Sequence, residues 1–363
     1  MGHSIAKFGG RRERGVALLV TLMVIAILVA VTVEAHRRVR NVVLETAAGS
    51  ERERLLSRAR SGIEIARAML LFDKSGSTAD SVQEDWARPE KRDELLAQLK
   101  VPPGSLSFSI SDLMGRIQVN ALVTQPDGKD FVQAQSLLWD RFLRPLESAR
   151  EGADLNSTTD IINSLKDWLD LNDDDAVTGL NGAESDYYEG LDPPYKARNG
   201  PMRDVSELLL VKGVTPELYY GTEKVPGIAP FVTTYGAVVA GTGEDRKISY
   251  PGRINISTAP LPVIRALLKP EDADLAESIV SYREARESDT FTHDVTQVNW
   301  YKGAPGCSEL VIDQSLLAVS SDVFEVSATA RGENMAATVT AVLVREKDAT
   351  GAWTCRIVSW RAG

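Results

Sequence analysis

The amino-acid sequence predicts an α+β fold: one long N-terminal helix packed on an antiparallel sheet, with a large, mainly helical domain inserted between the strands. Three observations predict it. An uncharged run at 16–33 continues into an amphipathic, proline-free stretch that extends to residue 71. Alternating, strand-like segments occur at 105–120 and again at 323–360. The residues between these two regions have a mostly helical pattern.

The chain begins with a short basic leader, which ends at Gly15 and is followed by an apolar run from Val16 to Val33. At about 1.5 Å per residue, a run of this length crosses most of a bilayer core as a helix. Basic residues ahead of a span keep the N-terminus cytoplasmic, so the rest of the chain is expected on the periplasmic side of the inner membrane. A plain single-pass anchor is the alternative. The basic residues of the leader are Lys7, Arg11, Arg12 and Arg14.

The expected processing point lies before the apolar run. A secretory signal places a small-residue cleavage site after its apolar region, but here Glu34 follows directly. Cleavage between Gly15 and Val16 would retain the apolar helix, an order that resembles type IV pilin-like precursors. Such precursors usually carry Glu at the fifth position after the glycine, where this chain has Val20. The resemblance implies that a subunit without this Glu can sit where no neighbour lies above it.

The apolar run is expected to continue as one helix to about residue 71. Its second half has apolar residues at the i, i+3, i+7 spacing of one helix face, and this stripe should pack on a sheet. The helix would be roughly 80 Å long, and Asp73 to Gly76 are expected to end it. The residues of the stripe are Leu56, Ala59, Ile63, Ala66 and Leu70.

Five strand-like runs are expected to form one sheet. Residues 105–110 and 116–120 are predicted to pair as a hairpin, and three further runs follow near the C-terminus, within 323–360. Because the ends of a compact unit often lie close together, a domain can be inserted between such strands. The expected segments are 1–15 (leader), 16–75 (N-terminal helix), 76–121 (first part of the α/β domain), 122–318 (inserted helical domain) and 319–363 (C-terminal strands).

The inserted region contains two segments that pair helices around a tight connection, at 205–216 and 259–283. They look like helix-hairpin-helix units, which in other proteins grip the DNA backbone. However, the second connection, Lys269–Asp272, has no glycine and carries two acids. The chain has a net charge of −10, and its leader is positive, so the remainder is strongly acidic. Nucleic acid is therefore not expected as a partner, because phosphate binding requires basic patches.

The densest carboxylate cluster lies at 167–175, and further oxygen-bearing side chains follow it. Calcium takes six to eight oxygen ligands, which such a loop can supply. Counted from Asp173, suitable side chains fall at positions 1, 3, 9 and 12, but Val177 and Thr178 stand where an EF-hand needs an acid or amide and a glycine. The sequence therefore predicts a calcium loop of another type. A solvated acidic loop is the alternative.

The sequence shows no catalytic constellation, and no enzymatic activity is expected. Its three histidines are far apart, and it has no Gly-x-Ser-x-Gly segment, phosphate loop or dinucleotide fingerprint. Two cysteines, Cys307 and Cys355, lie late in the chain. In an oxidising periplasm they could form one disulfide. Two separate buried thiols are the alternative.

Taken together, these residues resemble the minor pseudopilin K family of the bacterial type II secretion system over nearly the whole chain. Each short motif is common, but their order over so much sequence is specific. The matching segments are Arg14–Leu18; Asp112, Gly115, Arg116, Asn120 and Leu122; Asp167–Asp170; Gly182–Glu184; Tyr188; Pro193–Tyr195; Asn199; Pro201–Met202; Glu207–Leu208; Pro230–Thr233; and Asn255–Ala259.

The resemblance implies a pilin-like body and a tip complex with the minor pseudopilins I and J, which starts and caps a short pseudopilus for protein secretion. It also implies contact with the major pseudopilin and the inner-membrane assembly platform, cleavage by a prepilin peptidase, and methylation of the new N-terminus. Calcium is implied on the acidic region, with Asp173, Asp175, Glu184 and Asp186 as ligands. Two other classes stay open: a minor pilin of a type IV pilus or competence system, and a membrane-anchored periplasmic hydrolase.

Overall fold

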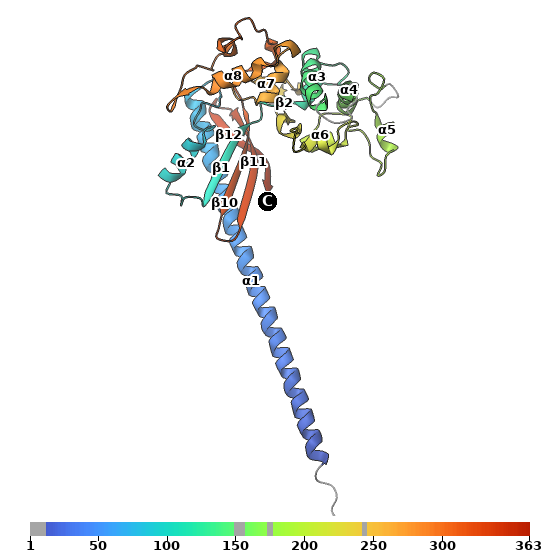
Figure 1. The fold of residues 1–363 in the computed structure, drawn as a ribbon, viewed down its shortest axis with the longest axis vertical. Helices are drawn as coiled ribbons and strands as arrows, with labels where there is room; N and C mark the ends of the chain where they lie inside the picture. The colour runs from blue at the N-terminus through green and yellow to red at the C-terminus, as the bar shows by residue number, and fades with distance from the viewer. Residues whose placement is uncertain (1–11, 149–156, 173–176, 242–244) are drawn as a thin grey trace, which may run out of the picture.

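The computed structural model describes residues 12–148, 157–172, 177–241 and 245–363. Its first element is α1 (Arg12–Gly76), a helix of 65 residues that stands away from the body as a rod (Figure 1). At about 1.5 Å per residue, α1 is roughly 100 Å long. The single continuous helix that the sequence predicts is therefore confirmed.

A four-stranded antiparallel sheet lies against the far half of α1, in the order β1-β10-β11-β12. The three predicted C-terminal strands are confirmed. β1 pairs with β10, although the chain leaves the sheet after β1 and returns only at β10. The chain leaves the sheet after β1 and re-enters it at β10 at the same end, because Asp112 is opposite Phe324. The strands are β1 (Leu106–Asp112), β10 (Val323–Arg331), β11 (Ala336–Lys347) and β12 (Trp353–Ala362).

The predicted apolar stripe of α1 packs on this sheet and is buried. Each large aliphatic side chain buried in this way stabilises the fold by roughly 1.5–3 kcal/mol. Gly62 allows the close approach, because a Cβ atom at this position would lie 2.9 Å from the Cβ of Ala328 on β10. The buried residues of the stripe are Leu55, Leu56, Ala59, Ile63, Ala66 and Leu70.

The expected hairpin between 105–110 and 116–120 is wrong. β2 (Ile117–Gln118) pairs in parallel with β3 (Val232–Thr233) in a separate two-stranded sheet. The chain turns out of the main sheet after Asp112, whose carboxylate accepts a hydrogen bond from the backbone N–H of Met114. Gly115 then passes so close to Thr258 that a Cβ would lie 2.7 Å from its Oγ1. Alternating polarity identified the strands but not their partners.

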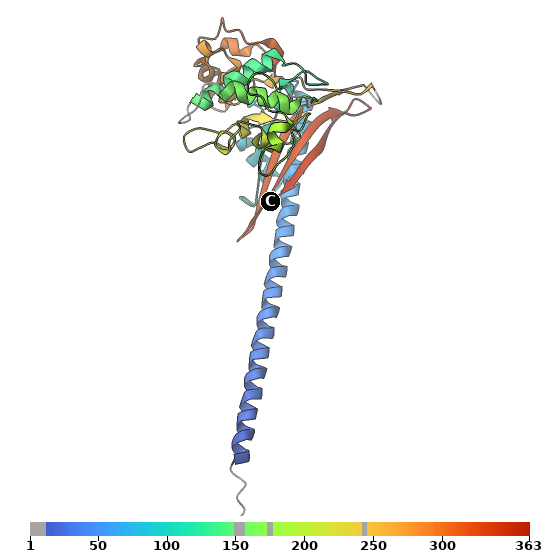
Figure 2. The same ribbon diagram turned by 90° about the vertical axis from the view of Figure 1, so that its right-hand side faces the viewer.

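The region between β1 and β10 forms a unit with its own hydrophobic core, which begins at Ile117 and extends to Leu317. Figure 2 shows this unit beyond the sheet, at the end of α1 farthest from the N-terminus. Its helices include the second predicted helix pair, α7 and α8, whereas the first pair is a 3-10 helix (Val205–Leu210) followed by α6. The helices are α3 (Gln133–Ser148), α4 (Ser157–Leu169), α5 (Ser185–Glu189), α6 (Pro216–Tyr220), α7 (Leu261–Leu267) and α8 (Leu275–Glu284).

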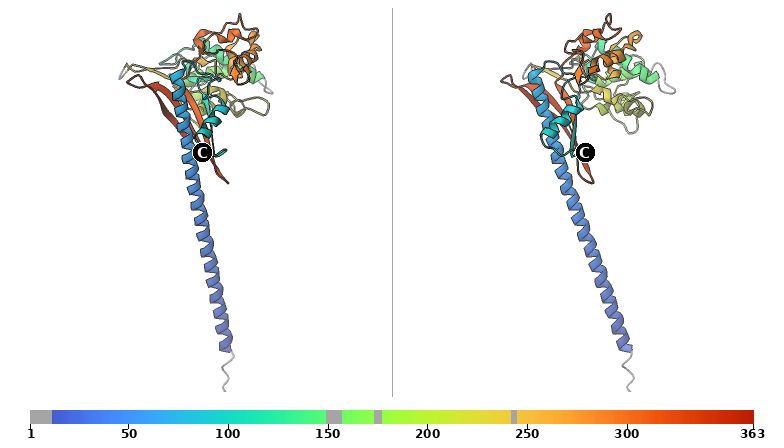
Figure 3. Two further views of the ribbon diagram at one scale, coloured as in Figure 1. Left: turned by 90° about the vertical axis from the view of Figure 1, so that its left-hand side faces the viewer. Right: turned by 60° about the vertical axis from the view of Figure 1, so that its left-hand side comes forward.

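Short strands complete this unit. β6 pairs in parallel with β9, and two small antiparallel hairpins, β4–β5 and β7–β8, lie at its surface. Outside the unit, α2 (Pro89–Gln98) lies beside α1, as both views of Figure 3 show. The short strands are β4 (Val238–Ala240), β5 (Lys247–Ser249), β6 (Ile254–Asn255), β7 (Arg286–Glu287), β8 (Thr290–Phe291) and β9 (Leu317–Ala318).

A buried polar network joins the inserted unit to the sheet. The Asn255 side-chain amide, on β6, donates hydrogen bonds to the Asp80 carbonyl, to Asp112 Oδ2 and to Ser321 Oγ. Thr258 donates a further hydrogen bond, 2.5 Å long, to Asp112. Burial raises the pKa of the Asp112 carboxyl, while the hydrogen bonds from Ser321 and Thr258 act in the opposite direction. Since a buried polar group without a partner is costly, this network fixes the position of the inserted unit.

Candidate metal centre and membrane anchor

The first half of α1 is an apolar surface that the rest of the chain does not cover. Among the described residues, α1 is the one helix long and apolar enough to cross a membrane, and none of its most apolar window is buried. Its exposed side chains include Val16 (61%) and Val20 (56%). The predicted processing pair, Gly15 and Val16, lies in the first turns of this helix. Burial in lipid is the physical way to remove this surface from water.

Two groups of three carboxylates lie close together in the described structure. The first, Asp73, Asp80 and Glu84, already contains internal cations. Arg345 contacts Asp73 and Asp80, and the Nζ of Lys74 lies 3.3 Å from Oδ2 of Asp80. These two cations offset much of the negative charge of the group from within, so it is described as a structural ion cluster and not as the candidate metal centre.

The second group is the candidate metal centre: Asp167, Asp170 and Glu184. One oxygen from each carboxylate lies within 4.8 Å of the others, and all three residues are buried. Asp167 lies in α4, Asp170 follows the end of that helix, and Glu184 precedes α5. Because α4 has 3.6 residues per turn, the spacing of three places Asp167 and Asp170 on one side.

Asp167 also organises the loop that leads to Glu184. Its carboxylate accepts hydrogen bonds from the backbone N–H groups of Thr178 (3.1 Å) and Ala183 (2.8 Å). Gly182 makes room for this carboxylate, because a Cβ there would lie 2.1 Å from Oδ2 of Asp167. The loop is therefore held against α4 by the same side chain that contributes to the carboxylate group.

Two lysines lie beside this group in the described part of the chain. The Nζ of Lys166 lies 3.2 Å from Oδ2 of Asp170 and 3.0 Å from Oγ1 of Thr178. The Nζ of Lys212 is directed instead to the carbonyl oxygens of Asn181 and Gly182. Three clustered carboxylates are costly to bury unless cations compensate them. Oxygen ligands of this kind are those that calcium prefers, so the residues present fit a calcium ion.

Of the two predicted calcium ligands that the structure describes, Glu184 and Asp186, it places one in this group. Glu184 is buried within it, whereas Asp186 is exposed and belongs to neither carboxylate group. Asp173 and Asp175 lie outside the described residues. The predicted ligand set did not include Asp167 and Asp170, which belong to this carboxylate group. Their spacing of three on a helix was the available signal, but the denser acidic run after them drew the prediction further along the chain.

The two cysteines are free thiols, so the structure adopts the second alternative that the sequence left open. Cys307 is buried in the core of the inserted unit, and Cys355 is buried in the core between α1 and the sheet. The disulfide that the sequence left possible is absent from the structure, because the two side chains belong to separate hydrophobic cores.

Comparison with known proteins gives a consistent result. The family model described as type II secretion system (T2SS), protein K matches residues 115–235. The type II secretion system protein K of Klebsiella pneumoniae is 28% identical over 209 residues, which cover 57% of this chain and 60% of that protein. The protein of the same name from Pseudomonas aeruginosa is 29% identical over 298 residues, covering 79% of this chain and 78% of that protein.

The chain spans about 60% of the length of several curated relatives that it matches, including the one from Aeromonas hydrophila (61%). A solved structure, the GspK-GspI-GspJ complex from the type 2 secretion system of enterotoxigenic Escherichia coli, contains a chain with the same fold. The TM-score is 0.58 at 18% sequence identity, and the match covers 88% of this chain and 99% of that one.

The apolar helix, the antiparallel sheet and the inserted unit define a class of protein: an α+β protein with a pilin-like fold, in which one helix of the described residues, at the N-terminus, is long and apolar enough to cross a membrane. The particular proteins that it resembles are the type II secretion system protein K of several bacteria, through the family model over residues 115–235 and through relatives at 28–29% identity. The relatives are named as components of a secretion system, which agrees with the sequence-based expectation that the protein is not an enzyme.

Proposed function

We propose that this protein is the minor pseudopilin at the tip of a type II secretion pseudopilus, where it initiates and caps assembly for export of folded proteins. The observation that carries the proposal is the position of the inserted unit. It lies beyond the sheet at the far end of α1, where the next subunit of a helical fibre would stack (Figures 1 and 2). A bulky unit at that place excludes a subunit above and leaves room only below.

Val20 supports the same position. In pilin-like subunits the Glu usually found at this place is thought to pair with the amino terminus of a neighbour within the membrane. An apolar Val20 removes that pairing, which a terminal subunit does not need. We infer that the N-terminus is cytoplasmic, that the body is periplasmic, and that a prepilin peptidase cleaves between Gly15 and Val16 before the new N-terminus is methylated.

The proposed partners are the minor pseudopilins I and J in a tip complex, followed by the major pseudopilin and the inner-membrane assembly platform. The solved complex supports the first two, because it contains GspK together with GspI and GspJ. The exposed apolar face of α1 offers the surface on which neighbouring membrane helices would pack.

We also propose that calcium binds at Asp167, Asp170 and Glu184. When bound, the ion supplies positive charge to three buried carboxylates. The chain's own residues position the loop around the site. Asp167 accepts hydrogen bonds from the backbone N–H groups of Thr178 and Ala183, and Glu184 lies at the start of α5. The site would thus order the surface of the inserted unit. Asp173 and Asp175 remain predicted ligands from the neighbouring loop.

Co-purification tests the tip assignment. The full-length protein, expressed with its own secretion operon, is isolated from membranes after mild solubilisation. We expect two smaller pilin-like proteins in about equal amounts, and no retained DNA. Recovery with DNA would favour the competence class, and recovery alone, with hydrolytic activity, would favour the anchored enzyme. A variant that lacks residues 122–318 has no inserted unit to exclude a subunit above it. More than one copy of this variant should therefore enter each fibre.

A further inference from the structure

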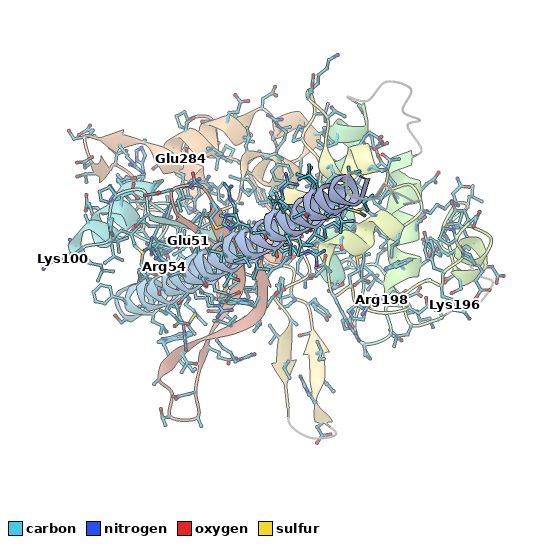
Figure 4. The ribbon with its side chains drawn as sticks, turned by 90° about the horizontal axis from the view of Figure 1, so that it is seen from below. Glu51, Arg54, Lys100, Lys196, Arg198 and Glu284 are labelled. Carbon is cyan, nitrogen blue, oxygen red and sulfur yellow. The ribbon has the colours of Figure 1, made fainter. Side chains whose placement is uncertain are left out.

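A groove of about 1010 Å³ lies between the last turns of α1 and α2. Residues of α1 from Glu64 to Gly76 form one wall, and α2 together with the segment before it forms the other. In Figure 4, α2 lies beside α1, and Lys100 marks the residues that follow α2. The wall formed by α1 is about three turns, or roughly 18 Å, long.

The floor of this groove is apolar. On α1, Ile65, Met69 and Phe72 recur at i, i+4 and i+7, a second stripe beside the one that packs on the sheet. Phe72 is 82% exposed, and Leu99, after α2, is 52% exposed. A phenylalanine left so open is unusual in a helix whose other apolar face is fully buried. The groove therefore has the apolar surface of an interface.

The rim of this groove is acidic. Five carboxylates and one lysine line it. Asp73 is held by Arg345 from within the body, whereas the carboxylates of Glu64, Asp85 and Glu94 are exposed at the surface. A cation from outside would be attracted to these three exposed carboxylates. The charged residues of the rim are Glu64, Asp73, Glu84, Asp85, Glu94 and Lys91.

We propose that the groove is a docking site for a basic amphipathic helix of a partner protein. The apolar floor would receive one apolar face about three turns long, at the spacing with which a helix packs between two others. The acidic rim would contact Lys or Arg on both sides of that face, and charge complementarity of this kind selects the partner. The proposal does not depend on the tip role, because it follows from the groove alone.

Site-specific cross-linking tests it. The photoreactive residue benzoylphenylalanine replaces Phe72 in the full-length protein, in native membranes. The probe is a 14-residue helical peptide of leucine and lysine in amphipathic spacing, and a peptide with glutamate for lysine is its counterpart. The matched protein control carries benzoylphenylalanine at Val311, which is 72% exposed and far along the chain in the inserted unit. Adsorption of the probe to the membrane is the same for both proteins.

We expect the lysine peptide to cross-link from position 72 at least tenfold more than from position 311, and the glutamate peptide to cross-link equally weakly from both. The double variant Asp85→Asn and Glu94→Gln should lower the yield from position 72 several-fold. Its matched control neutralises two exposed acids elsewhere, Glu271→Gln and Glu309→Gln, and should leave the yield unchanged. Equal yields from positions 72 and 311, or equal yields with the two peptides, would overturn the proposal.

A second measurement covers the possibility that the substituted proteins fold differently. Phe72→Ser changes a side chain that is mostly exposed, so the melting temperature should stay within about 2 °C of the parent. The Phe72→Ser variant and the parent protein are each added as competitors to the cross-linking reaction with the lysine peptide. If the variant keeps its stability and lowers the cross-linking yield as much as the parent protein does, the docking site is not at this groove. Loss of competition at unchanged stability supports it.

Discussion

Arg345, on β11, donates a hydrogen bond from its guanidinium to the carboxylate of Asp80, and neither side chain has any exposed surface. The same guanidinium lies 3.4 Å from Asp73, near the end of α1, and over the ring of Phe324. It also donates a hydrogen bond to the backbone carbonyl of Ser321. One side chain thus joins α1, the sheet and the strand that returns from the inserted unit.

Replacing Arg345 with Met should destabilise the protein strongly. The change leaves Asp80 buried with only Lys74 as a charged partner, and breaking one side of a buried pair costs about 3–5 kcal/mol. The free energy of unfolding, measured with denaturant on the detergent-solubilised protein, checks this. The matched control is Arg356→Met, whose exposed pair with Glu346 should contribute less than about 1 kcal/mol. Equal losses in the two variants would contradict the assigned role of Arg345.

The stability of the body should fall as the pH rises from about 4 to 7. Burial and the neighbouring carboxylates Glu84 and Asp80 raise the folded-state pKa of Asp73 to about 7, well above the ordinary range of an aspartate, while Arg345 acts in the opposite direction. The folded state therefore holds a proton that the unfolded state has released, and the stability this provides is lost as the pH passes the folded pKa.

Asp73→Asn should flatten this pH dependence, and should stabilise the protein relative to the parent at pH 8 more than at pH 5. Denaturant midpoints at several pH values between 4 and 8 measure the effect. An unchanged slope in Asp73→Asn would show that other groups carry the pH dependence.

Calcium should stabilise the protein and bind with measurable heat. Asp170→Asn and Glu184→Gln each remove one anionic oxygen from the proposed site, so each should weaken binding by about tenfold or more. Asp186→Asn serves as the control, because Asp186 is exposed and outside the group, and it should change affinity less than about twofold. Calorimetric titration of the full-length protein with calcium, after a chelator has removed bound metal, measures these affinities. No heat and no shift in melting temperature would remove the calcium proposal.

The two thiols should react only after unfolding. Burial raises the pKa of Cys355 to about 11 and also raises the pKa of Cys307. Because the thiolate is the reactive form, alkylation at pH 8 should be slow in the folded protein. Unfolding in denaturant without a reducing agent should then expose two alkylatable thiols, counted by mass spectrometry. Finding none under these conditions would mean that a disulfide forms after all.

Much of the architecture could be predicted from the sequence because its signals are local. The long helix follows from an uncharged run and a heptad-like stripe, and the C-terminal strands follow from alternation. The pairing of β1 could not be predicted, because its partner lies more than 200 residues away in the sequence and alternation carries no information about partners. The need for glycine at position 62 likewise could not be predicted, because it arises from the close approach of Ala328 in the folded structure.

The sequence predicted the region of the candidate metal centre, but only one of its three carboxylates. Composition identified the acidic segment, and Glu184 was included correctly in the group that the structure brings together. Asp167 and Asp170 were missed because burial decides which carboxylates lie together, and burial depends on packing of α4 against the rest of the inserted unit. The groove beside α2 was not predicted, since its second wall comes from a separate helix.

The central claim is that α1 is a retained membrane helix, freed by cleavage directly before its apolar run. The mass and N-terminal sequence of the protein isolated from membranes of its own cells test this most directly. We predict that the mature chain begins at Val16. A chain that begins at Met1, or one that has lost residues 16–33, would contradict the claim.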